Sequence, residues 1–348
     1  MKVKPVMDAL GRRGVDVVLI HTGQHYDAAM SRVFFDELGL RVPDSSLGVG
    51  SGAHSEQTAR IMIALEPVIA DVRPDVVVVV GDVNSTMAAA LVAAKSMVRL
   101  AHVEAGLRSR DWSMPEEVNR VVTDTLSNDL LAPSPDAVEN LLAEGHSPQR
   151  IHLVGNVMID TLLANVDRAI SSDALARFEL SPHTYGLVTL HRPSNVDDQA
   201  TLKELLHALG LVATECPLIL PAHPRLAPQL AALDIPQGVT VIDPLGYLDF
   251  LAMEASARLV LTDSGGVQEE TTALGVPCLT VRETTERPIT ISEGTNVLVG
   301  CDPARIVNEA RRVLRAGVRP RCPSLWDGKA GERIAEVLLA PVAPRASS

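Results

Sequence analysis

The stretch Val76–Thr86 reads VVVVVGDVNST, and variants of this pattern recur along the chain. A run of β-branched residues is typical of a strand buried in a parallel sheet, and the polar residues after it mark the strand's end. Such runs alternate with helical patterns in both halves of the chain, which predicts an α/β fold with parallel sheets. The predicted strands are Val15–Ile20, Val76–Val80, Arg99–Val103, Leu130–Ala132, Ile151–Val154, Gly186–Leu190, Leu218–Leu220, Val239–Ile242, Leu259–Leu261, Cys278–Val281 and Asn296–Val299.

The strands fall into two successive sets, which indicates two domains. A chain of 348 residues is also longer than one ordinary hydrophobic core requires. We therefore predict two doubly wound, Rossmann-like domains, 1–157 and 158–327, joined through a helix at Val157–Ile170. A further helical pattern lies at Gly331–Leu339, and the Pro/Ala/Ser-rich end beyond it is expected to be disordered.

Polar clusters come directly after most of the predicted strands. Ligands of open α/β sheets bind outside the carboxyl ends of the strands. Because the clusters come from both halves of the chain, we predict that they line one cleft between two facing domains. The clusters are HTGQH after Ile20, GDVNST after Val80, EAGLRSR after Val103, HRPSN after Leu190, HPR after Ala222, DSGG after Thr262 and RETTERP after Val281.

Composition excludes some classes of partner and site. The formal net charge of −12 argues against sequence-independent binding to nucleic acid or to an anionic membrane. The longest apolar runs, such as Met87–Ala94, are too short to span a bilayer, and Met1–Leu10 does not resemble a signal peptide. The four cysteines show no metal-ligand spacing, so we expect reduced thiols in a cytoplasmic protein.

The segment DSGGVQEE, Asp263–Glu270, has two interpretations. Gly265 and Gly266 could bring backbone N–H groups and a helix N-terminus to a phosphate, with Ser264 donating as well and Glu270 accepting the hydroxyls of a ribose. The same residues also suit a simple turn in which Ser264 caps the helix. Neither a dinucleotide fingerprint nor a Walker loop is present.

Several acidic residues are candidates for acid–base chemistry. Asp82 ends the run of valines and Glu104 ends the next strand, where an unpaired buried charge would be costly. Asp82 could instead cap the following helix. Glu116 and Glu117 follow Pro115 in the first turn of a helix, where acids also favour the helix dipole without any further role. The dipole is the favoured interpretation for Glu117, and both remain open for Glu116.

Basic residues at strand ends indicate an anion site. His191-Arg192 and His223-Pro224-Arg225 each place an imidazole and a guanidinium after a strand, and Arg287 could join them at a pyrophosphate. Taken singly, each histidine could equally be an ordinary surface residue. No spacing predicts a metal site, and no motif predicts a covalent nucleophile.

Taken together, the motifs resemble the non-hydrolysing UDP-N-acetylglucosamine 2-epimerase family. The resemblance covers the chain from Met1 to Leu339, and it rests on GDVNST, HVEAGLRS, PEEVNR, HRPSNVD, DSGGVQEE and TTERP in this order. It implies a two-domain, glycosyltransferase-B-like fold whose last helix, 328–340, packs back on the first domain while 158–327 binds UDP. It also implies reversible conversion of UDP-GlcNAc to UDP-ManNAc by loss of the C2 proton and of UDP, then re-addition. The resemblance further implies that neither a cofactor nor a metal is required, that the protein forms a homodimer, and that the product supplies ManNAc units for surface polysaccharides.

The resemblance assigns roles to the residues that match the family's motifs. Carboxylates serve as acid and base, and a cationic, glycine-lined pocket holds the diphosphate. The residues are Asp82, Glu104, Glu116 and His191 for catalysis; Lys2, His223, Ser264, Gly265, Gly266, Glu270 and Arg287 for UDP; and Gln24 and His25 for a regulatory UDP-GlcNAc site.

The chain departs from the family at its start. The family opens with a strand and a GTRPE-like turn, whereas Met1–Leu10 matches the helix that follows them. We expect the missing strand and its arginine to lie upstream of Met1, because the other motifs are intact. Four alternatives stay open at this point: a hydrolysing 2-epimerase, a 2-epimerase of a more decorated UDP sugar, a glycosyltransferase of the same fold, and a nucleotide-sugar sensor without enzymatic activity.

Overall fold

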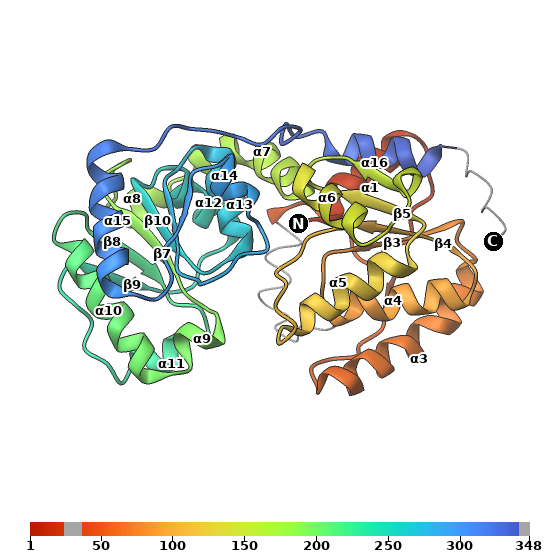
Figure 1. Cartoon of the computed structure of the whole chain (residues 1–348), viewed down its shortest axis with the longest axis horizontal. Helices are drawn as coiled ribbons and strands as arrows, with labels where there is room; N and C mark the ends of the chain where they lie inside the picture. Colours follow the sequence, from red (N-terminus) through yellow and green to blue (C-terminus); the bar gives the residue numbers. More distant parts are fainter. Residues whose placement is uncertain (24–36, 341–348) are drawn as a thin grey trace. The chain divides into compact units, whose positions relative to one another are not determined.

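The structure, a computed structural model, describes residues 1–23 and 37–340. The chain divides into two compact units (Figure 1). The first unit consists of the described residues of Met1–Thr161 and of Ser324–Ser348, and the second is Leu162–Pro323. Gln24 and His25 and the end of the chain beyond residue 340 lie outside the described residues.

The first unit contains a four-stranded parallel sheet in the order β3-β4-β5-β6. Valines on one side of β3 pack with helices α1 and α16, and those on its other side pack with α3 and α4. The strands are β3 (Val76–Val80), β4 (Arg99–Val103), β5 (Asp129–Ala132) and β6 (Ile151–Leu153), and the helices are α1 (Val3–Arg12), α3 (His54–Val72), α4 (Asn84–Lys95), α5 (Pro115–Leu126), α6 (Pro135–Ala143), a 3₁₀ turn (Pro148–Arg150), α7 (Val157–Ile170), which continues into the second unit, and α16 (Ala330–Leu339).

The prediction of a first strand at Val15–Ile20 was wrong in extent. Only Ile20–His21 forms β1, and it pairs with the equally short β2 (Ser45–Ser46). Val15 and Val17 instead pack beside the α1–α16 core. Among the described strands β3 hydrogen-bonds only to β4, so it forms the edge of its sheet. This edge position explains why just one of its valines, Val79, is fully buried.

The second unit contains a six-stranded parallel sheet in the order β12-β11-β10-β7-β8-β9. This order is that of a doubly wound fold, and it reverses direction between β7 and β10. The predicted α/β class with Rossmann-like sheets is therefore confirmed. The strands are β7 (Gly186–Thr189), β8 (Leu218–Pro221), β9 (Val239–Ile242), β10 (Leu259–Thr262), β11 (Cys278–Thr280) and β12 (Asn296–Leu298).

Helices cover both faces of this second sheet. The long helices α10 and α15 pack on one face through leucine, isoleucine and valine side chains, and α12 and α13 pack on the other around Tyr185 and Met253. The helices of the unit are α8 (Ala174–Arg177), α9 (Pro193–Val196), α10 (Gln199–Ala213), α11 (Ala227–Leu230), α12 (Tyr247–Ala255), α13 (Gly265–Leu274), α14 (Ile289–Ser292) and α15 (Pro303–Ala316).

The last helix, α16, belongs to the first unit and packs against the first helix, α1. Asp160 on α7 accepts hydrogen bonds from the N–H groups of Ala330 and Gly331, at 3.0 and 2.7 Å, and so caps α16. Gly331 permits close packing on α1, because a β-carbon there would stand 2.5 Å from the carbonyl oxygen of Pro5. The close contact between α1 and α16 therefore depends on a glycine at position 331, which has no side chain.

Replacing Gly331 by alanine is expected to destabilise the protein. The added methyl group must push α16 away from Pro5, and overpacking of this kind costs about 1–3 kcal/mol. Gly11→Ala in α1 is the matched control, because a β-carbon at Gly11 meets nothing within 4 Å and alanine favours the helix. Urea denaturation of both variants checks the prediction, and equal stabilities would contradict it.

Candidate active site

Asp82 follows β3, and two residues of α5 donate hydrogen bonds to it. The Arg120 guanidinium donates to its carboxylate from Nε and Nη2 at 3.0 and 2.6 Å. Asn119 donates to its backbone carbonyl at 2.8 Å. Its side chain stays one-quarter exposed, so this charged and firmly positioned carboxylate is open to solvent. Arg120 and Asn119 were missed by sequence reasoning, although both lie in the PEEVNR motif.

Glu104 ends the neighbouring strand β4 in an unusual state. Its backbone φ of 72° lies in the left-handed region, and its side chain is 4% exposed. One carboxylate oxygen is 2.6 Å from the Lys2 ammonium nitrogen, and the other is buried without a hydrogen-bond partner among the described residues. Such backbone strain and an unmet buried acceptor each cost about 1–3 kcal/mol and tend to occur at functional sites. Lys2, predicted to bind UDP, thus meets one of the predicted catalytic acids.

The two glutamates at the start of α5 differ in their surroundings. Glu116 is half-buried. Glu117 is buried, and its carboxylate accepts hydrogen bonds from the N–H groups of Ser109 and Arg110 and from Arg120. Although burial alone raises the pKa of Glu117, these donors lower it overall. Glu117 does lie in the first turn of α5, as predicted, and its hydrogen bonds additionally fix the loop after β4.

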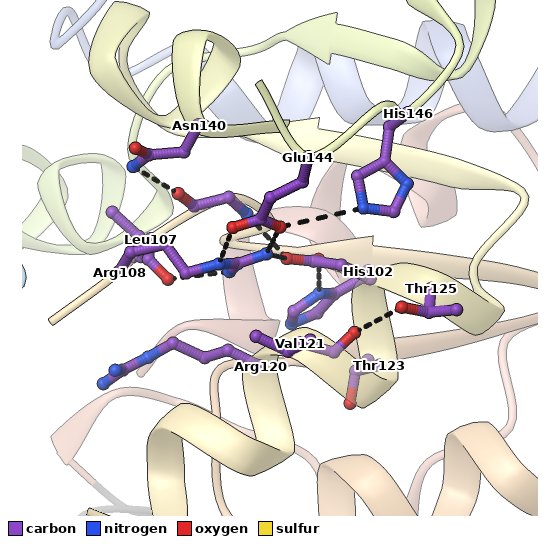
Figure 2. Close-up of polar contacts among 12 residues, drawn as sticks. His102, Leu107, Arg108, Arg120, Val121, Thr123, Thr125, Asn140, Glu144 and His146 are labelled. Atoms are coloured by element: carbon purple, nitrogen blue, oxygen red, sulfur yellow. Dashed lines mark hydrogen bonds and ion pairs between the residues drawn. The ribbon is translucent and has the colours of Figure 1, made fainter. Parts of the chain in front are cut away.

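Asp124 is the centre of an ionic network that includes His102 and Arg108 and extends to Glu144 (Figure 2). Asp124 on α5 contacts His102 through one oxygen at 2.6 Å, and Arg108 through the other at 2.7 Å. Arg108 also forms a bidentate pair with Glu144, at 2.8 and 2.6 Å. His102 and Arg108 belong to the HVEAGLRS motif, but their partner Asp124 carries no sequence signal of its own.

The second unit brings several predicted residues to the point where its sheet reverses direction. His191 follows β7, and its Nδ1 is 2.8 Å from Asp263, which follows β10. The His191 and His223 rings lie with their centroids 5.6 Å apart. Asp263 is fully buried and accepts hydrogen bonds from the backbone N–H groups of His191 and Arg192. Asp263, the first residue of the DSGG motif, is thus a further functional candidate that sequence reasoning missed.

The glycines of DSGG begin helix α13. The Ser264 hydroxyl accepts from the Val267 N–H at 3.5 Å, which is a long capping contact. The helix starts at Gly265, two residues earlier than predicted, so the N–H groups of Gly265 and Gly266 lie in its first turn. Those groups lack acceptors within the helix, and with the helix dipole they suit an anion. A β-carbon at Gly265 would stand 2.6 Å from the Glu286 carboxylate.

Glu269 and Arg287 form a buried ion pair with 2.6 Å between Oε1 and Nε. Their side chains are only 2% and 6% exposed. The expectation that Glu269 is an ordinary first-turn acid was therefore wrong. Arg287 was predicted to bind a diphosphate, and in the structure its guanidinium pairs with Glu269. The adjacent Glu286 lies 2.7 Å from Arg282 and 3.6 Å from Arg192.

Glu270 lies beside a second buried carboxyl group, that of Glu254 on α12. The side chains are 4% and 0% exposed, and the Tyr247 hydroxyl lies 3.1 Å from the Glu270 carboxylate. Burial, followed by the proximity of Glu270, raises the pKa of Glu254 well above its usual range, and burial also raises the pKa of Glu270. Both carboxyl groups therefore hold a proton up to a higher pH than an ordinary glutamate does.

Two general findings concern metals and membranes. In residues 1–23 and 37–340, no group of three or more His, Cys, Asp or Glu side chains could hold a metal ion. No helix in the same residues is long and apolar enough to cross a membrane.

Comparison with known proteins identifies similar sequences over nearly the whole chain. Residues 8–339 match the family model described as UDP-N-acetylglucosamine 2-epimerase. A UDP-N-acetylglucosamine 2-epimerase of Methanocaldococcus jannaschii is 41% identical over 97% of this chain and 95% of its own length. A UDP-2,3-diacetamido-2,3-dideoxy-D-glucuronate 2-epimerase of Pseudomonas aeruginosa is 42% identical over 92% of this chain and 90% of its own length.

Solved structures give the same result. The M. jannaschii enzyme in complex with UDP-GlcNAc and UDP aligns with a TM-score of 0.89 at 42% identity, covering 97% of this chain and 95% of that one. The Neisseria meningitidis UDP-GlcNAc 2-epimerase bound to UDP-GlcNAc aligns with a TM-score of 0.89 at 27% identity, covering 97% and 95%. A sucrose-phosphate synthase with a TM-score of 0.60 at 15% identity shares the fold alone, which is glycosyltransferase-B-like.

Replacing Glu254 by glutamine is expected to stabilise the protein at high pH. The wild-type group has a raised pKa in the folded state, so its stability is greatest below the unfolded pKa of about 4.3 and falls as the pH rises through the folded pKa. Glutamine cannot ionise but can still donate to Glu270. The free energy of unfolding of the variant relative to wild type should therefore increase as the pH rises from 5 to 8.5.

Urea denaturation across that pH range measures the effect. Glu204→Gln, an exposed change on α10, is the control and should give a difference that does not depend on pH. A flat difference for Glu254→Gln would show that Glu254 is not held protonated.

Proposed function

The chain belongs to the UDP-N-acetylglucosamine 2-epimerase family, and from this premise we propose that it interconverts UDP-GlcNAc and UDP-ManNAc by eliminating and re-adding UDP. The observation that carries the proposal is the pair of carboxylates at the ends of adjacent strands. Asp82 is fixed and partly exposed, while Glu104 is strained, buried and only partly satisfied. Inverting a C–H centre by elimination needs a group that removes a proton and a group that returns one.

The proposed reaction balances without an oxidant or reductant. A carboxylate takes the proton from C2 while the C1–O bond breaks and its electron pair leaves with UDP, giving a 2-acetamidoglucal. A proton then returns to the opposite face of C2, and the UDP oxygen adds back to C1. We propose Asp82, Glu104 and Glu116 for the proton transfers, with His191 stabilising the leaving diphosphate.

The second unit supplies the features that suit UDP. The first turn of α13 offers N–H groups of Gly265 and Gly266 to the diphosphate. His191, oriented by Asp263, and His223 lie at the sheet's reversal point, where ligands of doubly wound folds bind. Glu270, in the same helix α13, can receive both ribose hydroxyls. We assign Ser264, Arg287 and Lys2 to UDP binding as well.

Further parts of the proposal concern regulation and context. Gln24 and His25 form a regulatory UDP-GlcNAc site, the chain acts as a homodimer in the cytoplasm, and its product enters surface polysaccharides. A specific observation favours one second candidate. The P. aeruginosa relative is a 2-epimerase of a diacetamido glucuronate, so this chain could take a decorated UDP sugar through the same chemistry.

Solvent exchange at C2 tests the reaction. UDP-GlcNAc incubated with the protein in D₂O should gain deuterium at C2 and yield UDP-ManNAc, both followed by NMR. Free ManNAc and UDP would indicate a hydrolysing enzyme instead. Turnover of UDP-2,3-diacetamido-glucuronate alone would support the second candidate. Absence of C2 deuterium in a preparation that transfers the sugar to an acceptor would reject epimerisation in favour of a glycosyltransferase.

Substitution of the proposed acid–base residues should lower turnover sharply. Asp82→Asn, Glu104→Gln and Glu116→Gln should each reduce kcat by about 10²–10⁴-fold, which is the usual contribution of a proton-transferring group. Glu66→Gln, an exposed change on α3, is the matched control and should keep full activity. Any of the three variants with wild-type kcat would remove that residue from the proton transfers.

A further inference from the structure

His102 lies on β4, two residues before Glu104, and its ring is completely buried. Its two ring nitrogens face different elements. Nδ1 is 2.6 Å from the Asp124 carboxylate on α5. Nε2 is 2.8 Å from the carbonyl oxygen of Gly81, the residue before Asp82. The ring therefore links α5, β4 and the loop that carries a proposed catalytic acid.

These partners determine how many protons the ring carries. A backbone carbonyl only accepts, so Nε2 must donate. The other oxygen of Asp124 receives the Gly106 N–H at 3.1 Å and the Arg108 guanidinium at 2.7 Å, both of which only donate. Two such donors stabilise the ionised form of Asp124, so Nδ1 must also donate. A neutral imidazole has a single N–H, and a ring that donates at both nitrogens is an imidazolium.

The charged groups around the ring agree with this assignment. Although burial alone lowers the pKa of His102, the Asp124 carboxylate raises it overall, with a further contribution from Glu104. The pKa of Asp124 is lowered by His102 and Arg108 despite its burial. The remaining charged or titratable groups of the network are Arg108, Glu144 and His146, which lies 3.9 Å from Glu144 (Figure 2). Lys2 forms an ion pair with Glu104.

His102 completes the restraints on the Gly81–Asp82 segment. It holds the carbonyl of Gly81, Asn119 holds the carbonyl of Asp82, and Arg120 holds the carboxylate of Asp82. Gly81 has a positive φ of 75°, and its own N–H donates to the Val103 carbonyl at 3.1 Å. Removing the donor at His102 would leave the Gly81 carbonyl buried without this partner and would release the turn that aims Asp82.

We propose that His102 is a positioning residue, a permanently charged imidazolium that fixes the Gly81–Asp82 turn for proton transfer. This inference rests on the proposed function of Asp82, but the charge state of the ring does not. Glutamine cannot replace the ring. Its single amide could donate to Gly81, but its carbonyl oxygen would then face the Asp124 carboxylate.

The charge state is tested on the wild-type protein by ¹⁵N NMR of its histidine side chains from pH 5.5 to 9. One histidine, assigned through its loss in His102→Gln, should show both ring nitrogens protonated throughout that range. A neutral ring at pH 7.5, or titration near pH 6.5, would overturn the proposal. This measurement stands whether or not the protein proves to act on UDP-GlcNAc.

The positioning role is tested by kinetics. His102→Gln should lower kcat about 10²-fold, the cost expected from a misplacement of about 1 Å, while KM changes less than about threefold. His152→Gln on β6 of the same sheet, a half-exposed histidine, is the control and should keep wild-type kinetics. Full activity in His102→Gln would refute the role. Absence of C2 exchange in the wild type would refute the proposed function instead, leaving the NMR result intact.

A second variant, Asp124→Asn, tests the same proposal in case His102→Gln does not fold. Asp124→Asn keeps the shape of the side chain but removes the negative charge, so His102 should become titratable and kcat should fall similarly. The double variant should be no worse than the more impaired single one, because the two residues act as a unit. Additive losses, or a His102 in Asp124→Asn that still does not titrate, would contradict the mechanism.

Discussion

Buried carboxylates that accept backbone N–H groups hold the loops of this protein in place. Asp263 binds the amides of His191 and Arg192, and Asp124 binds that of Gly106. Glu117 does the same for Ser109 and Arg110. A buried charge is costly unless it is paired, and each of these carboxylates also meets a cationic or titratable side chain. The loops after the strands therefore have one favoured conformation, which an acid–base site needs.

The positions of the candidate site residues at strand ends could be predicted from the sequence, but their side-chain partners could not. Parallel strands bring their carboxyl ends to one edge, so the polar clusters after β-branched runs made Asp82, Glu104 and His191 candidates without a structure. Asp124 and Glu254 gave no such signal. Their importance comes from partners many residues away, as with His102 and Asp124, and from complete burial that no local pattern reveals.

Two misreadings have the same physical origin. The valines of β3 were expected to be buried but four of the five are only partly buried, and a strand was expected over all of Val15–Ile20, because β-branched runs favour strands. A strand also needs a neighbour to hydrogen-bond. Among the described residues β3 has one neighbour and β1 pairs over two residues, so local propensity gave the type of element but neither its length nor its burial.

Glu104 and Glu270 differ in their partners from the carboxylates that fix loops. Glu104 has one buried oxygen without a hydrogen-bond partner among the described residues, and the Glu270 carboxylate lies 3.1 Å from the Tyr247 hydroxyl. Asp124 and Asp263, by contrast, accept from several donors each. A carboxylate whose capacity is already used can position a loop, whereas one with capacity left can take a proton or a hydroxyl from a substrate. On this ground we propose that Glu104 and Glu270 contact the substrate, whereas Asp124 and Asp263 position loops.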